Sequence, residues 1–289
     1  MLPLLDTHLH LIAPERQQYT WTEGAPALVG RAFTLEAYRA LADPGGVGGA
    51  LFMEADAEDY RAEARMVAEW ARDPASGLLG LVASCRPEAE SDAGFEAWLE
   101  EAPELAVVGF RRILHQSPDD LSRSDIFRAN LRRIGARGLP FDLCFLARQL
   151  PVALELARAC PETRLVLDHC GVPDIGGNNF APWREAVRVL AGCDNVVAKL
   201  SGVFAYCAPG TASLATVRPW VEAVIEAFGP DRCLWGSDWP VVDMAGGDLP
   251  SWIAAFRTIL AGYSADEQAA MAHRTAERVY GVQLPAGGG

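Results

Sequence analysis

Short apolar segments alternate with longer amphipathic segments along the whole chain. Eight apolar segments are rich in Val, Leu and Phe, have the length of a strand and show no strict alternation, which is typical of strands buried on both faces of a parallel sheet. These predicted strands are Pro3–His8, Gly48–Glu54, Leu78–Ser84, Leu105–Leu114, Phe141–Leu146, Arg164–His169, Val196–Ser201 and Cys233–Ser237. They begin about 33 residues apart on average, which is the length of one strand–helix–strand unit.

Amphipathic helices are predicted between the strands. In Asp59–Asp73, the clearest of them, apolar residues recur at spacings of three and four. The others are Asp125–Arg137, Gln149–Cys160, Trp183–Ala191, Val217–Phe228, Ser251–Leu260 and Ala265–Tyr280. Eight consecutive strand–helix units without a dividing linker favour an α/β protein with one domain over residues 1–289, a (β/α)8 barrel.

One long irregular segment, Leu11–Phe33, follows the first strand. Loops of this length in a compact domain are usually functional, and the active sites of (β/α)8 barrels lie at the carboxyl ends of the strands. We therefore expect Leu11–Phe33 to cover the active site as a lid. We expect residues 285–289 to form a disordered tail.

Composition narrows the classes of protein. Half of the residues are hydrophobic, which excludes a disordered chain. A net charge of −13 argues against binding to nucleic acid, because phosphate contacts need clustered Lys and Arg. The first residues lack the pattern of a signal peptide, so we expect none. The sequence has no run of 18 apolar residues, and its seven cysteines include no C-x-x-C pair. We expect a cytoplasmic protein with reduced thiols and no membrane partner.

The candidate chemistry lies at the ends of three predicted strands. His8 and His10 are two residues apart, so both side chains point to one face of the first strand. His169 ends the sixth strand and Asp238 closes the eighth. Imidazoles with a carboxylate form a ligand set typical of Zn²⁺. Each residue also has a purely structural alternative. His8 and His10 could be buried histidines bonded to the backbone. His169 could be a core histidine held by Asp168, and Asp238 could cap a turn.

These residues, together with the strings GFRR, LDHCG, KLSG and WGSDWP, resemble the amidohydrolase superfamily, and within it the branch that contains sugar-lactone and 2-pyrone-4,6-dicarboxylate lactonases. The resemblance extends over about residues 3–282. It implies a distorted TIM barrel in which His8, His10, His169 and Asp238 match the polar centre. By this resemblance the four residues are metal ligands, Asp238 is the general base, and His169 polarises the substrate carbonyl or completes the metal shell.

The sequence departs from this family in ways that bear on the metal. Binuclear members bridge two metals with a carbamylated lysine, commonly on strand four, whereas the only lysine of this chain, Lys199, ends the seventh strand. The fifth strand, Phe141–Leu146, contains no histidine. We therefore expect at most one divalent ion, with Zn²⁺ as the first candidate. Some lactonases of this branch work without a metal.

Five further residues are candidates for substrate binding. They are Arg111, Lys199, His115, Tyr19 and Trp21. Arg111 matches the G-x-R of the family and could hold a substrate oxygen. Lys199 could stabilise an oxyanion or pair with the aspartate after strand eight. The two aromatic residues of the long loop could line the pocket, although each candidate has an alternative as an ion-paired, solvated or packed side chain.

We expect a hydrolase that opens a lactone, either a sugar (aldono-) lactone or a pyrone-dicarboxylate lactone. Two alternatives come from other classes of protein. A decarboxylase or other C–C lyase would use the same fold, and a non-catalytic protein would bind sugar acids without turnover. In each case the expected partner is a small molecule, and the sequence does not indicate an oligomeric state.

Overall fold

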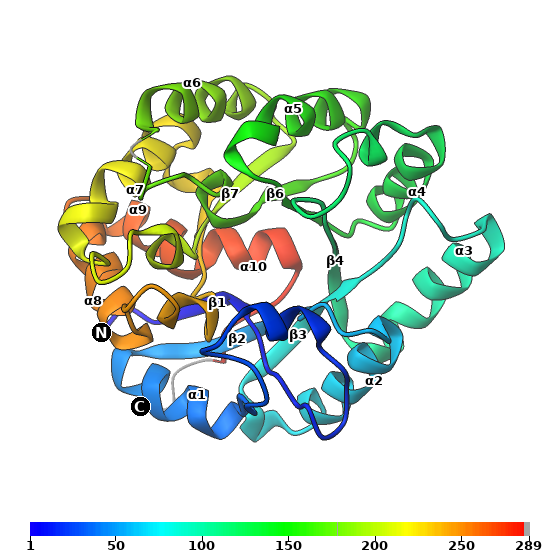
Figure 1. Ribbon diagram of the computed structural model, residues 1–289, viewed down its shortest axis with the longest axis horizontal. Coiled ribbons are helices and arrows are strands. Elements are labelled where there is room, and N and C mark those ends of the chain that lie inside the picture. Colours follow the sequence, from blue (N-terminus) through cyan, green and yellow to red (C-terminus); the bar gives the residue numbers. More distant parts are fainter. Residues whose placement is uncertain (178, 286–289) are drawn as a thin grey trace.

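Eight parallel strands form one sheet in which each strand pairs with the next in chain order (Figure 1). The computed structural model describes residues 1–177 and 179–285, so most of the predicted tail lies outside the described residues. The strands are β1 (Leu4–Leu9), β2 (Val47–Met53), β3 (Leu78–Ser84), β4 (Val107–Ile113), β5 (Phe141–Cys144), β6 (Leu165–Leu167), β7 (Val196–Leu200) and β8 (Cys233–Trp235). This topology confirms the predicted (β/α)8 barrel.

The barrel closes where the segment after β8 runs beside the end of β1. The backbone N–H of Asp238 donates to the carbonyl oxygen of His8 at 2.8 Å, and the N–H of His10 donates to the carbonyl oxygen of Trp239 at 2.9 Å. A parallel bridge joins Leu9 to Trp239 between these bonds. We call this contact, His8–His10 against Asp238–Trp239, the closing seam.

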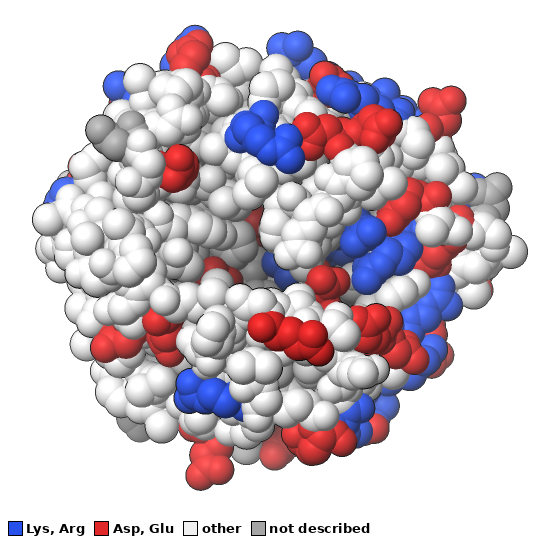
Figure 2. Space-filling view, in the orientation of Figure 1, with Lys and Arg blue, Asp and Glu red and all other residues white. Residues whose placement is uncertain are grey.

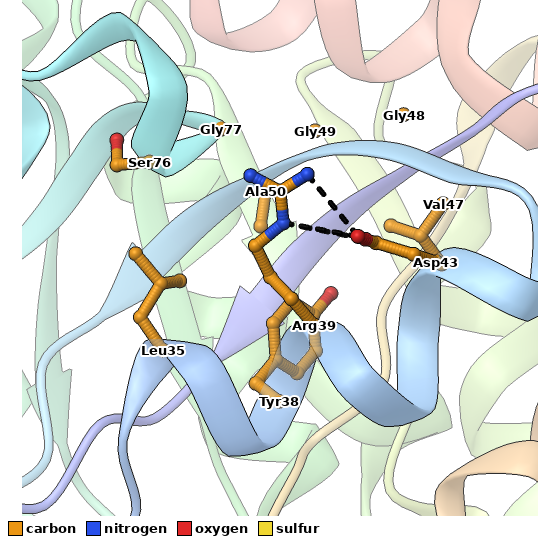
Figure 3. Close-up of a pocket in the computed structure, with 10 residues that line it drawn as sticks. All are labelled: Leu35, Tyr38, Arg39, Asp43, Val47, Gly48, Gly49, Ala50, Ser76 and Gly77. Carbon is orange, nitrogen blue, oxygen red and sulfur yellow. Dashed lines mark hydrogen bonds and ion pairs between the residues drawn. The ribbon is translucent and has the colours of Figure 1, made fainter.

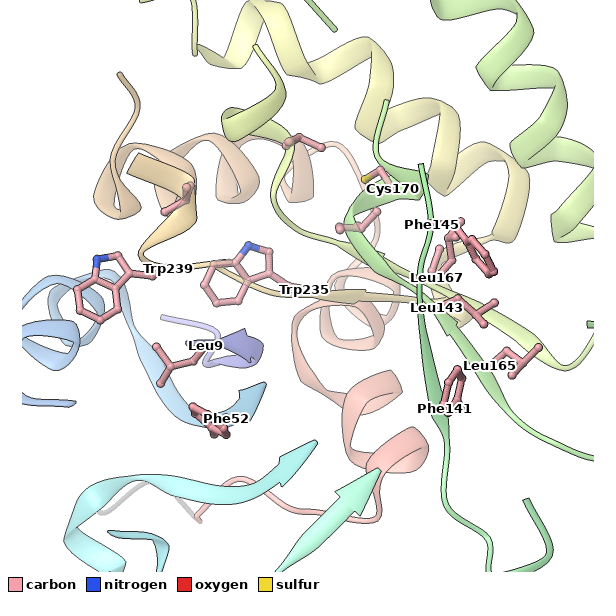
Figure 4. Packing of buried hydrophobic residues seen from close by; sticks show 14 of the residues in the cluster. Leu9, Phe52, Phe141, Leu143, Phe145, Leu165, Leu167, Cys170, Trp235 and Trp239 are labelled. Carbon is pink, nitrogen blue, oxygen red and sulfur yellow. The ribbon is translucent and has the colours of Figure 1, made fainter. Parts of the chain in front are cut away.

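Helices lie between and after the strands, and most of them cover the outside of the barrel. They are α1 (Leu35–Ala42), α2 (Tyr60–Ala71), α3 (Asp92–Glu101), α4 (Asp125–Ala136), α5 (Leu150–Ala159), α6 (Phe180–Ala191), α7 (Leu214–Phe228), α8 (Leu249–Leu260), α9 (Ala265–Ala269) and α10 (Thr275–Tyr280). Buried side chains such as Phe52, Phe141 and Trp235 belong to the large apolar cluster between strands and helices (Figure 4). Within the described residues, no helix is long and apolar enough to span a membrane.

Two helices, α1 and α3, are additions to the predicted set. Each begins at a hydroxyl residue, Thr34 or Ser91, whose side chain accepts a hydrogen bond from a backbone N–H of the first turn. Such caps satisfy backbone donors that a helix start otherwise leaves unpaired.

The last helix fills the amino end of the barrel. The predicted helix Ala265–Tyr280 divides into α9, a π-helical turn and α10. Val279 and Tyr280 of α10 pack with strand residues such as Leu5 and Val82 in a second buried cluster. Figure 1 shows α10 within the ring of strands. Because α10 occupies this end, the site can open only at the carboxyl ends of the strands.

Several strands end one or two residues earlier than the sequence predicts, and two of these early ends bear on the site. β6 ends at Leu167 and β8 at Trp235, two to three residues before His169 and Asp238. Both of these residues have left-handed backbone conformations, with φ values of 53° and 59°. A left-handed residue cannot continue a strand, so the two functional candidates lie in the turns that follow the strands.

Candidate active site

The end of β1 supplies two histidines. Because side chains alternate along a strand, His8 and His10 face the interior while Leu9 between them packs in the outer apolar cluster (Figure 4). The rings of His8 and His10 are 4.9 Å apart. Nδ1 of His10 lies 3.0 Å from the carbonyl oxygen of Met53, which can only accept. The proton of His10 is therefore on Nδ1, and Nε2 presents its lone pair to the site.

Asp238 is held against these histidines by the closing seam. Its Oδ1 lies 3.4 Å from Nε2 of His10 and 3.7 Å from Nε2 of His8. Its Oδ2 lies 3.7 Å from Nδ1 of His169 and is buried without a hydrogen-bond partner. An unpartnered buried carboxylate oxygen calls for an explanation, and a bound cation or a transferred proton would supply one.

His169 reaches the same point from the turn after β6. Its ring centre is 4.3 Å from that of His8, and its Nδ1 is 3.0 Å from the hydroxyl of Ser201. Burial lowers the pKa of His169, so its imidazole is neutral near pH 7. Gly202 makes this approach possible, because a Cβ there would lie 2.6 Å from Nδ1 of His169 and 2.7 Å from Oδ2 of Asp238.

The Asp6 side chain connects the two segments of the closing seam by hydrogen bonds. Its Oδ1 accepts from the backbone N–H groups of His8 at 3.0 Å and Ser237 at 2.8 Å. Its Oδ2 accepts from the hydroxyl of Tyr38 at 2.6 Å. Figure 3 shows Tyr38 at a small pocket of about 30 Å³ between α1 and β2, where Arg39 pairs with Asp43. None of the predicted site residues lines that pocket.

The donor atoms at the seam fit a divalent cation. Ligand atoms of His8, His10 and Asp238 lie within 4.8 Å of one another, and a second group with the same property joins His8, Asp168 and His169. The free lone pair of His10 and the unpartnered oxygen of Asp238 belong to the first group. The four predicted ligands thus divide between two groups that share His8.

Arg111 lies inside the barrel on β4 and is almost fully buried. Its Nε donates to Oε1 of Glu54 and its Nη2 donates to the backbone carbonyl of Glu54, both at 2.7 Å. Its Nη1 lies 3.2 Å from Nε2 of His8, and because a guanidinium can only donate, His8 accepts there. Burial raises the pKa of Glu54, but the Arg111 charge outweighs it and holds this pKa below its ordinary value.

Lys199 lies beneath the cavity in a fully buried group of charges. Its Nζ is 2.5 Å from Oδ2 of Asp142 and 3.2 Å from Oδ1 of Asp168. Tyr280 of α10 donates its hydroxyl to Asp142 at 2.9 Å. Lys199 is not among the residues that line the cavity. Asp142 and Asp168 hold the ammonium group of Lys199, so the structure does not pair it with Asp238, and its contact with substrate stays a prediction.

A cavity of about 200 Å³ opens above the histidines. Figure 2 shows a hollow near the centre of this face. Of the predicted residues, the cavity lining contains His10, Trp21, Arg111, His115, His169 and Asp238. Burial, and then repulsion by Arg111, lower the pKa of His115 to about 4, so His115 offers a neutral imidazole.

The long loop after β1 contributes one of its two predicted aromatic residues to the cavity. Trp21 lines it and donates its indole N–H to the carbonyl of Ala55 at 2.7 Å. Tyr19 is buried and instead lines a separate hollow formed largely by the loop itself, together with Thr22 and Leu28. Tyr19 thus lies outside the lining of the central cavity, and its contact with substrate stays a prediction.

Sequence analysis did not identify three buried carboxylates that support the site. Asp6 and Asp142 lie inside strands, and Glu54 follows β2 directly. Each is a charged residue within or at the end of an apolar segment, and burying a charge is costly unless it has a partner. A charged residue in an apolar segment is therefore the signal by which these three carboxylates could have been predicted.

Fold and site together define a class of protein: a (β/α)8 barrel whose strand ends present histidines and an aspartate, able to hold a metal ion, to a central cavity. The profile of the amidohydrolase family matches residues 5–282. The chain belongs to this family.

Similar proteins with known names include two L-fucono-1,5-lactonases. The chain is 38% identical to that of Burkholderia ambifaria over 149 residues, a match that covers about half of each protein. It is 27% identical to that of Burkholderia multivorans over 98% of this chain and 97% of the relative. The fold is similar to a crystal structure of a Burkholderia multivorans amidohydrolase with bound zinc, at 25% identity and a TM-score of 0.87, covering 97% of this chain and 100% of that one.

Proposed function

We propose that this protein hydrolyses a neutral sugar lactone and that a divalent metal ion, with Zn²⁺ as the first candidate, binds to His8, His10 and Asp238. One observation carries the proposal. The Asp238 carboxylate, with one oxygen buried and unpartnered, faces three imidazoles at the floor of a cavity. The similarity to named lactonases over nearly the full length supports the same reaction class.

The proposed reaction breaks the ring C–O bond of the lactone with one molecule of water. A bound divalent ion would polarise the carbonyl and acidify water. Asp238 accepts a proton from the attacking water at its unpartnered oxygen and returns it to the ring oxygen, which leaves as a hydroxyl group. When Ser201 donates to Nδ1 of His169, the His169 proton is on Nε2, from which it can donate to the developing oxyanion.

The charge of the cavity supports a neutral substrate. Among the described residues that line the cavity, Arg111 is the only permanently cationic one, and its guanidinium is already bonded to Glu54 and His8. Asp56 adds a carboxyl group to the same lining. A dicarboxylate would need free cationic donors to offset its charge, whereas the hydroxyl groups of a sugar lactone can bond to neutral imidazole and amide groups.

A panel of lactones tests this function. Neutral aldonolactones and 2-pyrone-4,6-dicarboxylate are compared in a pH-indicator assay, with and without added Zn²⁺. We expect kcat/KM for a neutral lactone to exceed that for the dicarboxylate by about 100-fold or more, as discrimination through unpaired buried charge allows. In the control variant Asp238→Asn, kcat falls by about 10²–10⁴ while the protein stays folded.

The same panel separates the alternatives. Release of CO₂ from carboxylated substrates would identify a lyase, and binding of sugar acids without turnover would identify a non-catalytic protein. Preference for the dicarboxylate would overturn the substrate class and leave lactone hydrolysis standing. A folded Asp238→Asn protein with more than about a tenth of the wild-type kcat would remove Asp238 from the mechanism.

A further inference from the structure

The Arg111 guanidinium contacts Nε2 of His8, the ring nitrogen that faces Asp238 and that a metal ion bound to His8, His10 and Asp238 would need. Nη1 of Arg111 is 3.2 Å from Nε2 of His8, and the same Nε2 is 3.7 Å from Oδ1 of Asp238. A neutral imidazole nitrogen has a single lone pair. It can accept a hydrogen bond from Arg111 or bind a metal ion, but it cannot do both at once.

The second ring nitrogen of His8, Nδ1, is also occupied by protein groups. Nδ1 lies 3.4 Å from Oδ1 of Asp168 and 3.3 Å from Nζ of Lys199. Because Nε2 accepts from Arg111, the proton of the neutral ring is on Nδ1 and is directed at Asp168. His8 is fully buried, so both of its nitrogens are held by protein groups.

Arg111 is itself firmly held. Two bonds of 2.7 Å connect its guanidinium to the side chain and backbone of Glu54, and both residues are buried. The Arg111 charge and the Lys199 charge lie on opposite sides of the His8 ring, at its two nitrogens. Both charges repel an approaching divalent ion, and the carboxylates paired with them offset part of this repulsion.

We propose that Arg111 competes with the metal ion for Nε2 of His8. In the metal-free protein the guanidinium saturates His8 and keeps the site ordered. A metal ion that takes His8 as a ligand must first break the Arg111–His8 contact, so Arg111 weakens metal binding. The inference concerns the metal part of the proposed function and rests on it, but it can be tested without any lactone.

The test measures Zn²⁺ affinity by isothermal titration calorimetry on full-length, metal-stripped protein. The test variant is Arg111→Met with Glu54→Gln, which removes both charges of the buried pair. The matched control is Arg112→Met with Glu88→Gln, because Arg112 is the next residue on β4 and pairs with Glu88 at 2.8 Å. Both double variants keep the net charge, and circular dichroism checks that each is folded.

We expect the test variant to bind Zn²⁺ at least about tenfold more tightly than the wild type, which is the scale of one charge-assisted hydrogen bond. The control should stay within about twofold of the wild type. Zn²⁺ binding by the test variant alone would also support competition. Equal affinities in wild type and test variant, or no Zn²⁺ binding by either, would overturn it.

Adding His8→Ala identifies the nitrogen at which competition occurs. In the wild-type background His8→Ala should weaken Zn²⁺ binding only slightly, because part of the His8 contribution is already lost to Arg111. In the Arg111→Met, Glu54→Gln background the same change should cost at least about tenfold more. Equal losses in both backgrounds would show that Arg111 does not act through His8. Lactone turnover is measured separately, so a failure of the proposed activity remains distinguishable from a failure of this inference.

Discussion

Gly202 shows how closely the site is packed at the level of single residues. Alanine there meets two obstacles, a backbone φ of 67° and a Cβ less than 3 Å from His169 and Asp238. We expect Gly202→Ala to lower kcat by about 100-fold, because a displacement of about 1 Å at reacting groups has that effect.

Gly210→Ala is the matched control for this change. Gly210 has a φ of 76°, but nothing lies within 4 Å of its added Cβ. The Gly210→Ala variant should lose about 1 kcal/mol of unfolding free energy because of backbone strain, and its kcat should stay unchanged. If Gly202→Ala loses only stability, like Gly210→Ala, then the glycine is needed for the turn and not for the approach of His169 to Asp238.

His115 links the cavity to the pH dependence of stability. Burial, and then Arg111, lower its pKa from 6.5 to about 4 in the folded protein. Between these values the unfolded chain binds the proton and the folded chain does not, so this contribution to stability is present above pH 6.5 and is lost as the pH falls towards 4. We expect His115→Gln to make the melting temperature less dependent on pH in this interval. An unchanged slope in thermal melts between pH 4 and 6.5 would contradict the prediction.

At the scale of elements, strand periodicity and motif spacing were enough to predict the barrel and to place His8 and His10 together. They could not predict where β6 and β8 end, because no local pattern marks His169 as a residue with positive φ. The Arg111–Glu54 pair was equally hidden, since it joins strands that are not adjacent in the sheet. Such pairs depend on three-dimensional register, which local sequence does not encode.

The loop 11–33 is a second element with a specific role. Its Trp21 lines the cavity and is tied to Ala55, whereas Tyr19 packs within the loop. Trp21→Ala should raise KM for the preferred lactone by about tenfold, because the half-buried indole lines the cavity and its contact with substrate would be lost, and should leave kcat less affected. Tyr19→Phe, which keeps the ring, serves as the control and should leave KM unchanged. Steady-state kinetics on several lactones measure both variants, and equal KM values would make the loop a scaffold only.

At the scale of the whole molecule, a buried polar network connects β5, the turn after β6, β7 and α10. Lys199 pairs with Asp142 and Asp168, and Tyr280 bonds to Asp142. Lys199→Met should cost about 3–5 kcal/mol of unfolding free energy, because it leaves carboxylates buried without their partner. Lys199→Met with Asp142→Asn should recover part of that loss in urea denaturation. A single variant that loses less than about 1 kcal/mol would show that water or a shifted side chain replaces the ammonium group.

The closing seam ties the site to the order in which the chain is made. Thr7 of β1 bonds to Trp235 of β8 across 228 positions, and the same seam sets His8 and His10 beside Asp238. His8 and His10 are synthesised long before Asp238, because β2 to β7 lie between them in the chain. A chain that ends before β8 therefore carries both imidazoles without the carboxylate that faces them in the folded protein. We therefore expect hydrolysis to begin only after β1 has met the segment that follows β8 at the closing seam.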